Sequence, residues 1–104
     1  MNVWQSKTAF KARVREWAQK LDVDVQVISI RQMRNKWASY TERSKLLIFN
    51  DQVLVVDRDL ADYVIVHELL HFRTPNHGKL WKSFMRAYLG DYEQMEKRLK
   101  GVGT

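Results

Sequence analysis

Three histidines and a glutamate are the residues of this chain best suited to metal chemistry. His67, Glu68 and His71 form the pattern His-Glu-x-x-His, and His77 follows six residues later. Residues four apart lie on one face of a helix, so His67 and His71 can bind one ion from adjacent turns. Glu68, rotated by about 100° from His67, can act on a water molecule at that ion without ligating it. We therefore expect a Zn²⁺ ion as cofactor.

The third ligand of this ion is less closely determined by the spacing. A chain reversal through Asn76 would swing His77 back toward the same point. Three neutral histidines and one water molecule would give a four-coordinate zinc with one exchangeable position, as in catalytic sites. The spacing alone permits other partners, and a closed structural site would need Glu68 or a remote carboxylate as its fourth ligand. A catalytic site is the favoured interpretation.

An isolated His-Glu-x-x-His pattern also occurs by chance. Here it lies in an expected helix that begins near Asp57 or Asp59, ends at about Phe72 and is followed by Pro75. That helix is apolar on nearly every side and should run through the interior, its apolar residues being Leu60, Val64, Ile65, Val66, Leu69, Leu70 and Phe72. Imidazoles and a carboxylate are costly to bury there without partners, which favours metal binding over a chance match.

The remaining elements predict an α+β fold. The first helix, over residues 6–20, has Ser6 or Thr8 as its cap. After it we expect strands over residues 23–30, 37–40 and 45–49, with a turn over 41–44 between the last two. Residues 53–56 are either a strand or a short helix. Beyond the histidines we expect a helix over 78–89 closed by Gly90, and a short one from Asp91 to about Gly101. This order indicates α+β with a small antiparallel or mixed sheet of three strands.

Composition limits the class of protein. At 104 residues and 45% hydrophobic content, the chain is expected to form a single domain over residues 1–104. It has no cysteine, which excludes disulfides and leaves histidine, carboxylate or backbone oxygen as metal ligands. No apolar run resembles a signal peptide or approaches the ~18 residues of a membrane span, so we expect a cytoplasmic protein without a membrane partner.

The net charge of +6 bears on the choice of partners. A basic surface favours acidic partners, nucleic acid included. No recognised nucleic-acid-binding motif accompanies the charge, so a solvated basic surface is the simpler interpretation. The sequence leaves the oligomeric state open.

Further blocks accompany the histidines between about residue 25 and residue 100. They are Arg31, Met33, Trp37 and Ser39; Asn50; Asp62-Tyr63-Val64; Asn76-His77; Trp81; and Asp91-Tyr92. Together with His-Glu-x-x-His, these residues resemble the YgjP-like metal-dependent hydrolases, relatives of SprT-like proteins and minigluzincins. Ala38 and Tyr40 stand where the family's Arg-Trp-Gly-Ser-Cys block has glycine and cysteine, and Phe49 stands where leucine is usual. Packing beneath this strand must therefore differ, and any role of that cysteine is lost.

The resemblance implies a minimal zincin-like domain. Such a domain has an N-terminal backing helix, a small sheet whose edge strand lies above a cleft, an active-site helix beneath, and two C-terminal helices. The resemblance also implies that His77 is the third zinc ligand. Minigluzincins are named for a glutamate in that role, so Asp91, Glu93 and Glu96 are the alternatives.

The activity that the resemblance implies is zinc-dependent hydrolysis of peptide bonds, with Glu68 as the general base. An extended peptide or protein substrate would pair with the edge strand at Trp37, Ala38, Ser39 and Tyr40. Trp37 is equally acceptable as a core aromatic. The groups considered for stabilising the oxyanion are Tyr88, Tyr92 and nearby arginines.

Two other functions are compatible with the sequence. The first is a latent or non-catalytic zinc domain whose C-terminal segment, from about Tyr92 to Thr104, occupies its own cleft. The second is a nucleic-acid-associated SprT-like protease or binding module, with Arg31, Arg34 and Lys36 as the basic residues that would meet phosphate groups.

Overall fold

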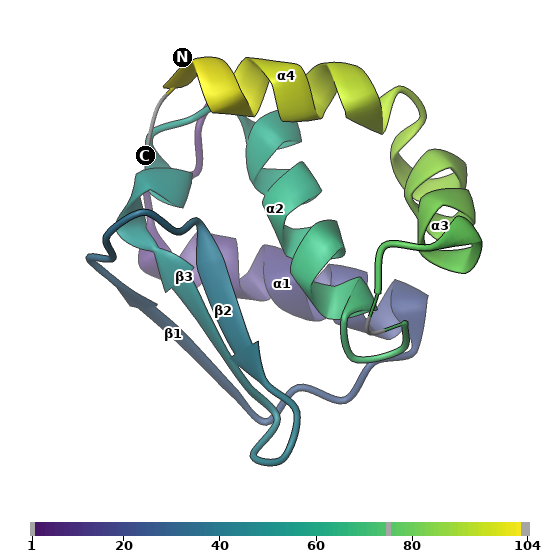
Figure 1. The fold of residues 1–104 in the computed structure, drawn as a ribbon. Coiled ribbons are helices and arrows are strands. Elements are labelled where there is room, and N and C mark those ends of the chain that lie inside the picture. Colours follow the sequence, from purple (N-terminus) through teal and green to yellow (C-terminus); the bar gives the residue numbers. More distant parts are fainter. Residues whose placement is uncertain (1, 75, 103–104) are drawn as a thin grey trace.

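The computed structural model describes residues 2–74 and 76–102. Its elements are α1 (Lys7–Leu21), β1 (Val27–Arg31), β2 (Ala38–Thr41), β3 (Leu46–Asn50), the 3₁₀ helix η1 (Asp51–Leu54), α2 (Arg58–Leu70), α3 (Lys79–Leu89) and α4 (Tyr92–Val102). In Figure 1, α2 lies at the centre, with the sheet to its left, α3 to its right, α4 above it and α1 below and behind. The α+β class, the three strands and the two C-terminal helices are confirmed.

The sheet is mixed and has the strand order β1-β3-β2. β1 runs parallel to β3 with Ile28 opposite Leu47, and β2 runs antiparallel to β3 with Ser39 opposite Ile48. β2 is therefore an edge strand, as expected. Leu47 and Phe49 of the central strand are fully buried. Phe49 meets Phe10 of α1 edge to face at 5.0 Å, which makes α1 the backing helix of the sheet.

The expected start of the first strand at Val23 is wrong. Asp22 takes a left-handed conformation (φ 55°), and its N–H donates to the carbonyls of Ala18 and Gln19. Val23 also donates its N–H to Ala18. These bonds satisfy carbonyls at the end of α1, so residues 22–23 terminate the helix and strand pairing begins at Val27.

Smaller differences affect the other boundaries. Ser6, rather than Thr8, caps α1 by accepting a hydrogen bond from the N–H of Ala9. The turn before β3 occupies residues 42–45 and ends on Lys45 with φ 56°. The ambiguous segment near residue 53 is the 3₁₀ helix η1, which is capped by the side chain of Asn50 accepting a hydrogen bond from the N–H of Gln52. α4 lies close to its expected bounds, and Asp91 accepts from the N–H of Gln94 at its start.

Helix α2 runs through the interior, as its apolar sequence predicts. It has buried residues on all sides: Leu60, Ala61, Tyr63, Val64, Ile65, Val66, Leu69 and Leu70. It starts at Arg58 after Asp57 and ends at Leu70, two residues before the expected Phe72. The expected exit at Pro75 lies outside the described residues. Within the described ranges, no helix combines the length and apolarity needed to cross a bilayer.

An ion pair between Arg13 of α1 and Asp62 of α2 attaches the two helices to each other. Both carboxylate oxygens accept from Arg13, at 2.9 and 2.8 Å, and one also accepts from Nε1 of Trp17 at 3.0 Å. These bonds fix how α2 lies on its backing helix, and α2 carries the residues of the site described next.

Candidate metal centre

His67 and His71 project from consecutive turns at the C-terminal end of α2. His71 is the C-cap residue, but its backbone stays helical (φ −62°, ψ −25°), so the four-residue spacing keeps its geometry. The two rings lie with centroids 5.1 Å apart. The sequence-predicted pair is therefore on one face of one helix.

His77 returns to this pair from the connection between α2 and α3. Its ring centroid is 4.8 Å from that of His67 and 4.9 Å from that of His71. Nε2 of His77 approaches Nε2 of His71 to 3.2 Å. Each ring offers a nitrogen within 4.8 Å of the others, and in the described part of the chain this is the group able to hold a metal ion. The donor set is all imidazole, which suits a transition metal.

Aromatic side chains pack against the rings of His67 and His77. Trp81 of α3 packs against His77 at 4.4 Å and against His67 at 5.1 Å. Tyr63, one turn before His67 on α2, places its hydroxyl 3.4 Å from Nδ1 of that ring. These contacts preorganise the histidines before any ion binds.

Burial keeps His67 uncharged. It lowers the pKa of His67 from 6.5 to about 3, with further lowering by the charges of His71 and His77. A neutral imidazole is the form that binds metal, because the ligating nitrogen needs a free lone pair.

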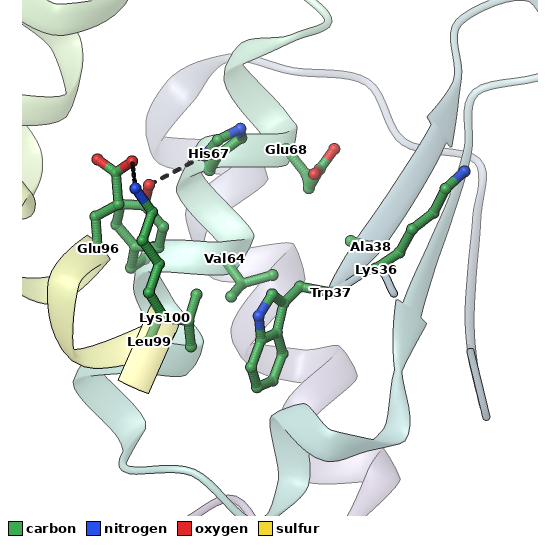
Figure 2. A pocket seen from close by; sticks show the side chains of 10 residues that line it. Lys36, Trp37, Ala38, Val64, His67, Glu68, Glu96, Leu99 and Lys100 are labelled. Atoms are coloured by element: carbon green, nitrogen blue, oxygen red, sulfur yellow. Dashed lines mark hydrogen bonds and ion pairs between the residues drawn. The ribbon is translucent and has the colours of Figure 1, made fainter. Parts of the chain in front are cut away.

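Glu68 faces a pocket of about 360 Å³ beside the histidines. Figure 2 shows α4 on one side of this pocket and the start of β2 on the other, with Val64, His67 and Glu68 of α2 between them. Burial raises the pKa of Glu68 from 4.5 to about 7, and the positive charge of Lys36, which also lines the pocket, acts in the opposite direction. Proton exchange by such a carboxyl is matched to neutral pH.

The four residues proposed from sequence as a substrate strand divide into two groups. Trp37 and Ala38 line the pocket with Glu68. Ser39 and Tyr40 are not among its lining residues, although both belong to β2. Tyr40 instead stacks on His71, with ring centroids 5.1 Å apart.

The alternative carboxylate ligands have other partners. Glu93 pairs with Arg86 at 2.7 Å, and Asp91 caps α4. Glu96 pairs with Lys100 at 3.5 Å, yet it also lines the pocket and, with His67, a neighbouring cavity of about 260 Å³. None of the three belongs to the metal-binding group found among the described residues.

The groups considered for the oxyanion lie off the Glu68 pocket. Tyr92 lines the neighbouring cavity, and Tyr88 is 40% exposed and packs on Trp17. In the pocket, the exposed cation whose charge acts on Glu68 is Lys36, not an arginine.

Sequence reasoning missed the roles of two aromatics around the histidines. Tyr63 and Trp81 were noted only as parts of the family blocks. The signal was available in their spacing: Tyr63 precedes His67 by four residues, and Trp81 follows His77 by four. Side chains four residues apart lie on the same face of a helix. His77 comes just before α3 and Trp81 lies in its first turn, so the same spacing brings these two side chains together.

Comparison with known proteins assigns the domain. Residues 4–101 match the sequence profile of the family described as YgjP-like, metallopeptidase domain. An uncharacterised protein of Methanocaldococcus jannaschii is 33% identical over 104 residues, covering 96% of this chain and 94% of that protein.

Two crystal structures are similar to this fold. The metallopeptidase zymogen jannalysin of Methanocaldococcus jannaschii superposes with a TM-score of 0.75 at 33% identity, over 89% of this chain and 93% of its own. The zymogen abylysin of Pyrococcus abyssi has a TM-score of 0.77 at 18% identity, over 90% and 94%, a likeness of fold alone. Since the family profile spans nearly the whole chain and includes the histidine cluster, this chain belongs to the YgjP-like family of metallopeptidases.

Proposed function

We propose that this protein is a zinc peptidase in which His67, His71 and His77 hold the ion and Glu68 is the general base. The observation that carries the proposal is the convergence of three ring nitrogens within 4.8 Å beside the pocket that contains Glu68. Glu68 lines the pocket without belonging to the cluster, so it is free for proton transfer.

The separation of two of the ligand nitrogens suits zinc. Ligand nitrogens at about 2.0–2.1 Å from a tetrahedral Zn²⁺ stand roughly 3.3 Å apart. The Nε2 atoms of His71 and His77 are separated by 3.2 Å. A site of three imidazoles leaves a fourth position for water or substrate, as catalytic zinc requires.

Glu68 would perform the proton transfers. A bound Zn²⁺ ion acidifies water and polarises a carbonyl group. The Glu68 carboxylate accepts a proton from the attacking water molecule and then donates it to the nitrogen of the leaving amine. The low polarity of the pocket around Glu68, with Trp37, Val64 and Leu99 in its wall, strengthens these electrostatic interactions.

The substrate would be an extended peptide added to the free edge of β2. The strand lies at the edge of the sheet and leads directly from Trp37 and Ala38 in the pocket wall. Main-chain hydrogen bonds to an edge strand give affinity with little side-chain selectivity. We assign Trp37 and Ala38 to contacts next to the scissile bond, and Ser39 and Tyr40 to the backbone pairing further along.

Replacing Glu68 by Gln tests the assignment of the general base. The Glu68→Gln protein should retain zinc at the parent stoichiometry and lose hydrolysis of an unstructured peptide by at least roughly a hundredfold. Glu42→Gln, in an exposed turn, is the control and should match the parent. If helix α4 keeps the parent inactive, the comparison is repeated with Arg98→Ala present in each protein. Full activity of Glu68→Gln would reject the assignment.

A second proposal is that the peptidase is latent, with α4 restricting the pocket. Glu96, Leu99 and Lys100 of α4 line the same pocket as Glu68. Figure 2 makes their position opposite Trp37 and Ala38 visible. The similar chain of jannalysin, at 33% identity, is a zymogen, which supports this proposal. The last two residues of the C-terminal segment, 103–104, lie outside the described residues.

Nucleic acid as a partner stays a prediction. Arg31, Arg34 and Lys36 are exposed on one stretch of chain, but Lys36 also lines the pocket of Glu68. We therefore assign Lys36 to the peptidase site. DNA binding can be measured separately, by the salt dependence of a DNA mobility shift.

A further inference from the structure

Tyr63, His67 and His71 follow one another at four-residue spacing along α2. The hydroxyl of Tyr63 is 3.4 Å from Nδ1 of His67, and their rings meet edge to face with centroids 5.6 Å apart. Tyr63 is 4% exposed, so this polar contact forms away from bulk water. His67 is thus held between a tyrosine one turn before it and a histidine one turn after it.

The contact bears on which nitrogen of His67 faces the ion. A neutral imidazole has one N–H and one lone pair, and a hydrogen bond at one nitrogen fixes the role of the other. With Nδ1–H donating to the Tyr63 hydroxyl, the lone pair is on Nε2. Nε2 is also the atom through which His71 and His77 approach each other.

Tyr63 then has a proton of its own to donate. Burial, followed by the charge of Glu96, raises the pKa of Tyr63 well above its usual value, so its hydroxyl remains protonated. Glu96 of α4, whose carboxylate pairs with Lys100 at 3.5 Å, lines the two cavities in which Tyr63 and His67 also take part. Metal-binding histidines commonly donate their second nitrogen to a partner of this kind, directly or through another group.

We propose that Tyr63 is a positioning residue that fixes the tautomer and orientation of His67 for metal binding, supported by Glu96 from helix α4. The inference rests on the proposed function only in taking His67 as a zinc ligand. It gives α4 a second role, since the helix that narrows the pocket also stabilises the metal site.

Zinc affinity measured by competition with a chromogenic chelator tests the proposal. Tyr63→Phe removes one hydroxyl and should weaken zinc binding by roughly 10-fold to 100-fold, the usual effect of losing such a partner. Tyr92→Phe is the matched control: Tyr92 is also 4% exposed and lines the same cavity of about 260 Å³. Its affinity should equal that of the parent. Equal affinity of Tyr63→Phe and the parent would overturn the proposal.

A spectroscopic measurement separates positioning from general loosening of the fold. In the metal-free protein, ¹⁵N–¹H correlation of the imidazole nitrogens should show His67 as the Nδ1–H tautomer in the parent and in Tyr92→Phe. In Tyr63→Phe it should be a mixture of tautomers, with unchanged backbone amide shifts outside α2. A parent His67 with its proton on Nε2 would contradict the assigned hydrogen bond.

Further variants distinguish an error in the proposed metal site from an error in the role of Tyr63. His67→Ala should lose zinc; if it binds like the parent, the proposed metal site itself is wrong. If His67→Ala fails to bind and Tyr63→Phe binds normally, only the role of Tyr63 is rejected. Glu96→Gln should reduce zinc affinity less than Tyr63→Phe does, and Glu93→Gln is the control on the same helix. If Glu96→Gln does not reduce zinc affinity, Glu96 has no part in positioning His67.

Discussion

The ring of Tyr40 lies parallel to the ring of His71, with an interplanar angle of 5° and centroids 5.1 Å apart. Tyr40 belongs to the edge strand β2, and His71 follows the last residue of α2. The sheet therefore contacts the metal centre through an aromatic face.

Loss of this stack should loosen His71. Aromatic pairs contribute about 0.5–1.5 kcal/mol beyond burial, so Tyr40→Ala should reduce zinc affinity by roughly threefold to tenfold. Tyr40→Phe keeps the ring and should bind zinc like the parent. Thr41→Ala, the next residue of the strand and exposed, is the control. An unchanged affinity of Tyr40→Ala in chelator competition would show that the stack does not hold His71.

Asp62 should matter for stability rather than for metal binding. It accepts two hydrogen bonds from Arg13 and one from Trp17, and its side chain is 14% exposed. Charged hydrogen bonds of this kind contribute about 1.5–3 kcal/mol, so Asp62→Ala should lower the free energy of unfolding by about 2–3 kcal/mol in urea titration.

The control for Asp62 uses the other acidic partner of Arg13. Glu16 is 58% exposed, and its pair with Arg13 should contribute little. Glu16→Ala is therefore expected to stay close to the parent in free energy of unfolding. Equal losses for the two variants would mean that the interior ion pair is not what attaches α1 to α2.

The free energy of unfolding of the metal-free protein should change with pH as Glu68 titrates. Its pKa is about 7 in the folded state against 4.5 for the free group. A carboxyl whose folded pKa is raised contributes stability that is complete below pH 4.5 and is lost as pH rises to about 7. Glu68→Gln lacks this loss, so its stability relative to the parent should increase across that window and level off above it.

His67 changes the free energy of unfolding with pH in the opposite direction, so its contribution must be separated from that of Glu68. Its folded pKa of about 3 lies below 6.5, so its contribution is present above pH 6.5 and is lost as pH falls. The parent and Glu68→Gln both lose the contribution of His67, so this loss cancels when their free energies of unfolding are subtracted. Urea titrations with chelator present, from pH 4 to pH 8, measure that difference. A value independent of pH would contradict the burial of the Glu68 carboxyl.

Latency should depend on the attachment of α4 to α2. Arg98 donates to Asp59 at 2.7 Å and to Asp57 at 3.0 Å at the start of α2. Because these pairs are exposed, Arg98→Ala should free α4 only partly and raise peptidase activity a few-fold. Lys97→Ala, an exposed neighbour that does not line the pocket, should have no effect. Lower or unchanged activity in Arg98→Ala would argue against α4 as a restraint.

Point variants suit this question better than deletion of the C-terminal helix. Tyr92 and Leu99 of α4 are 4% and 6% exposed and belong to the core. Removing the helix would expose the apolar face of α2 and unsettle the site with it. Deletion would therefore mix relief of latency with unfolding.

The fold class and the position of the histidines on a helix could be predicted because both depend on local periodicity. The spacing of His67 and His71, and the apolar residues around them, give the helix and its burial directly. The return of His77 depends on the path of the chain between α2 and α3, which spacing does not determine; only the resemblance supplied that ligand. The three-dimensional arrangement brings it within 3.2 Å of His71.

The arrangement of strands could not be obtained from pattern. Pairing of β1 with β3, and not with its neighbour in sequence, arises from contacts between distant segments. Asn50 illustrates this: its buried side chain donates to the carbonyls of Met33 and Lys36 and thereby shapes the loop that presents Lys36 and Trp37 to the pocket. A polar residue at the end of an apolar strand gives no sequence signal for such bonds. The stack of Tyr40 on His71 likewise follows from tertiary packing.

The most direct measurement of the central claim is anomalous diffraction at the zinc edge from crystals of the Glu68→Gln protein loaded with zinc. We expect one strong peak bonded to His67, His71 and His77 at about 2.0–2.1 Å, with the side chain at position 68 facing the remaining coordination position. A peak at a different place, or a carboxylate of Glu93 or Glu96 in the position assigned to His77, would contradict it.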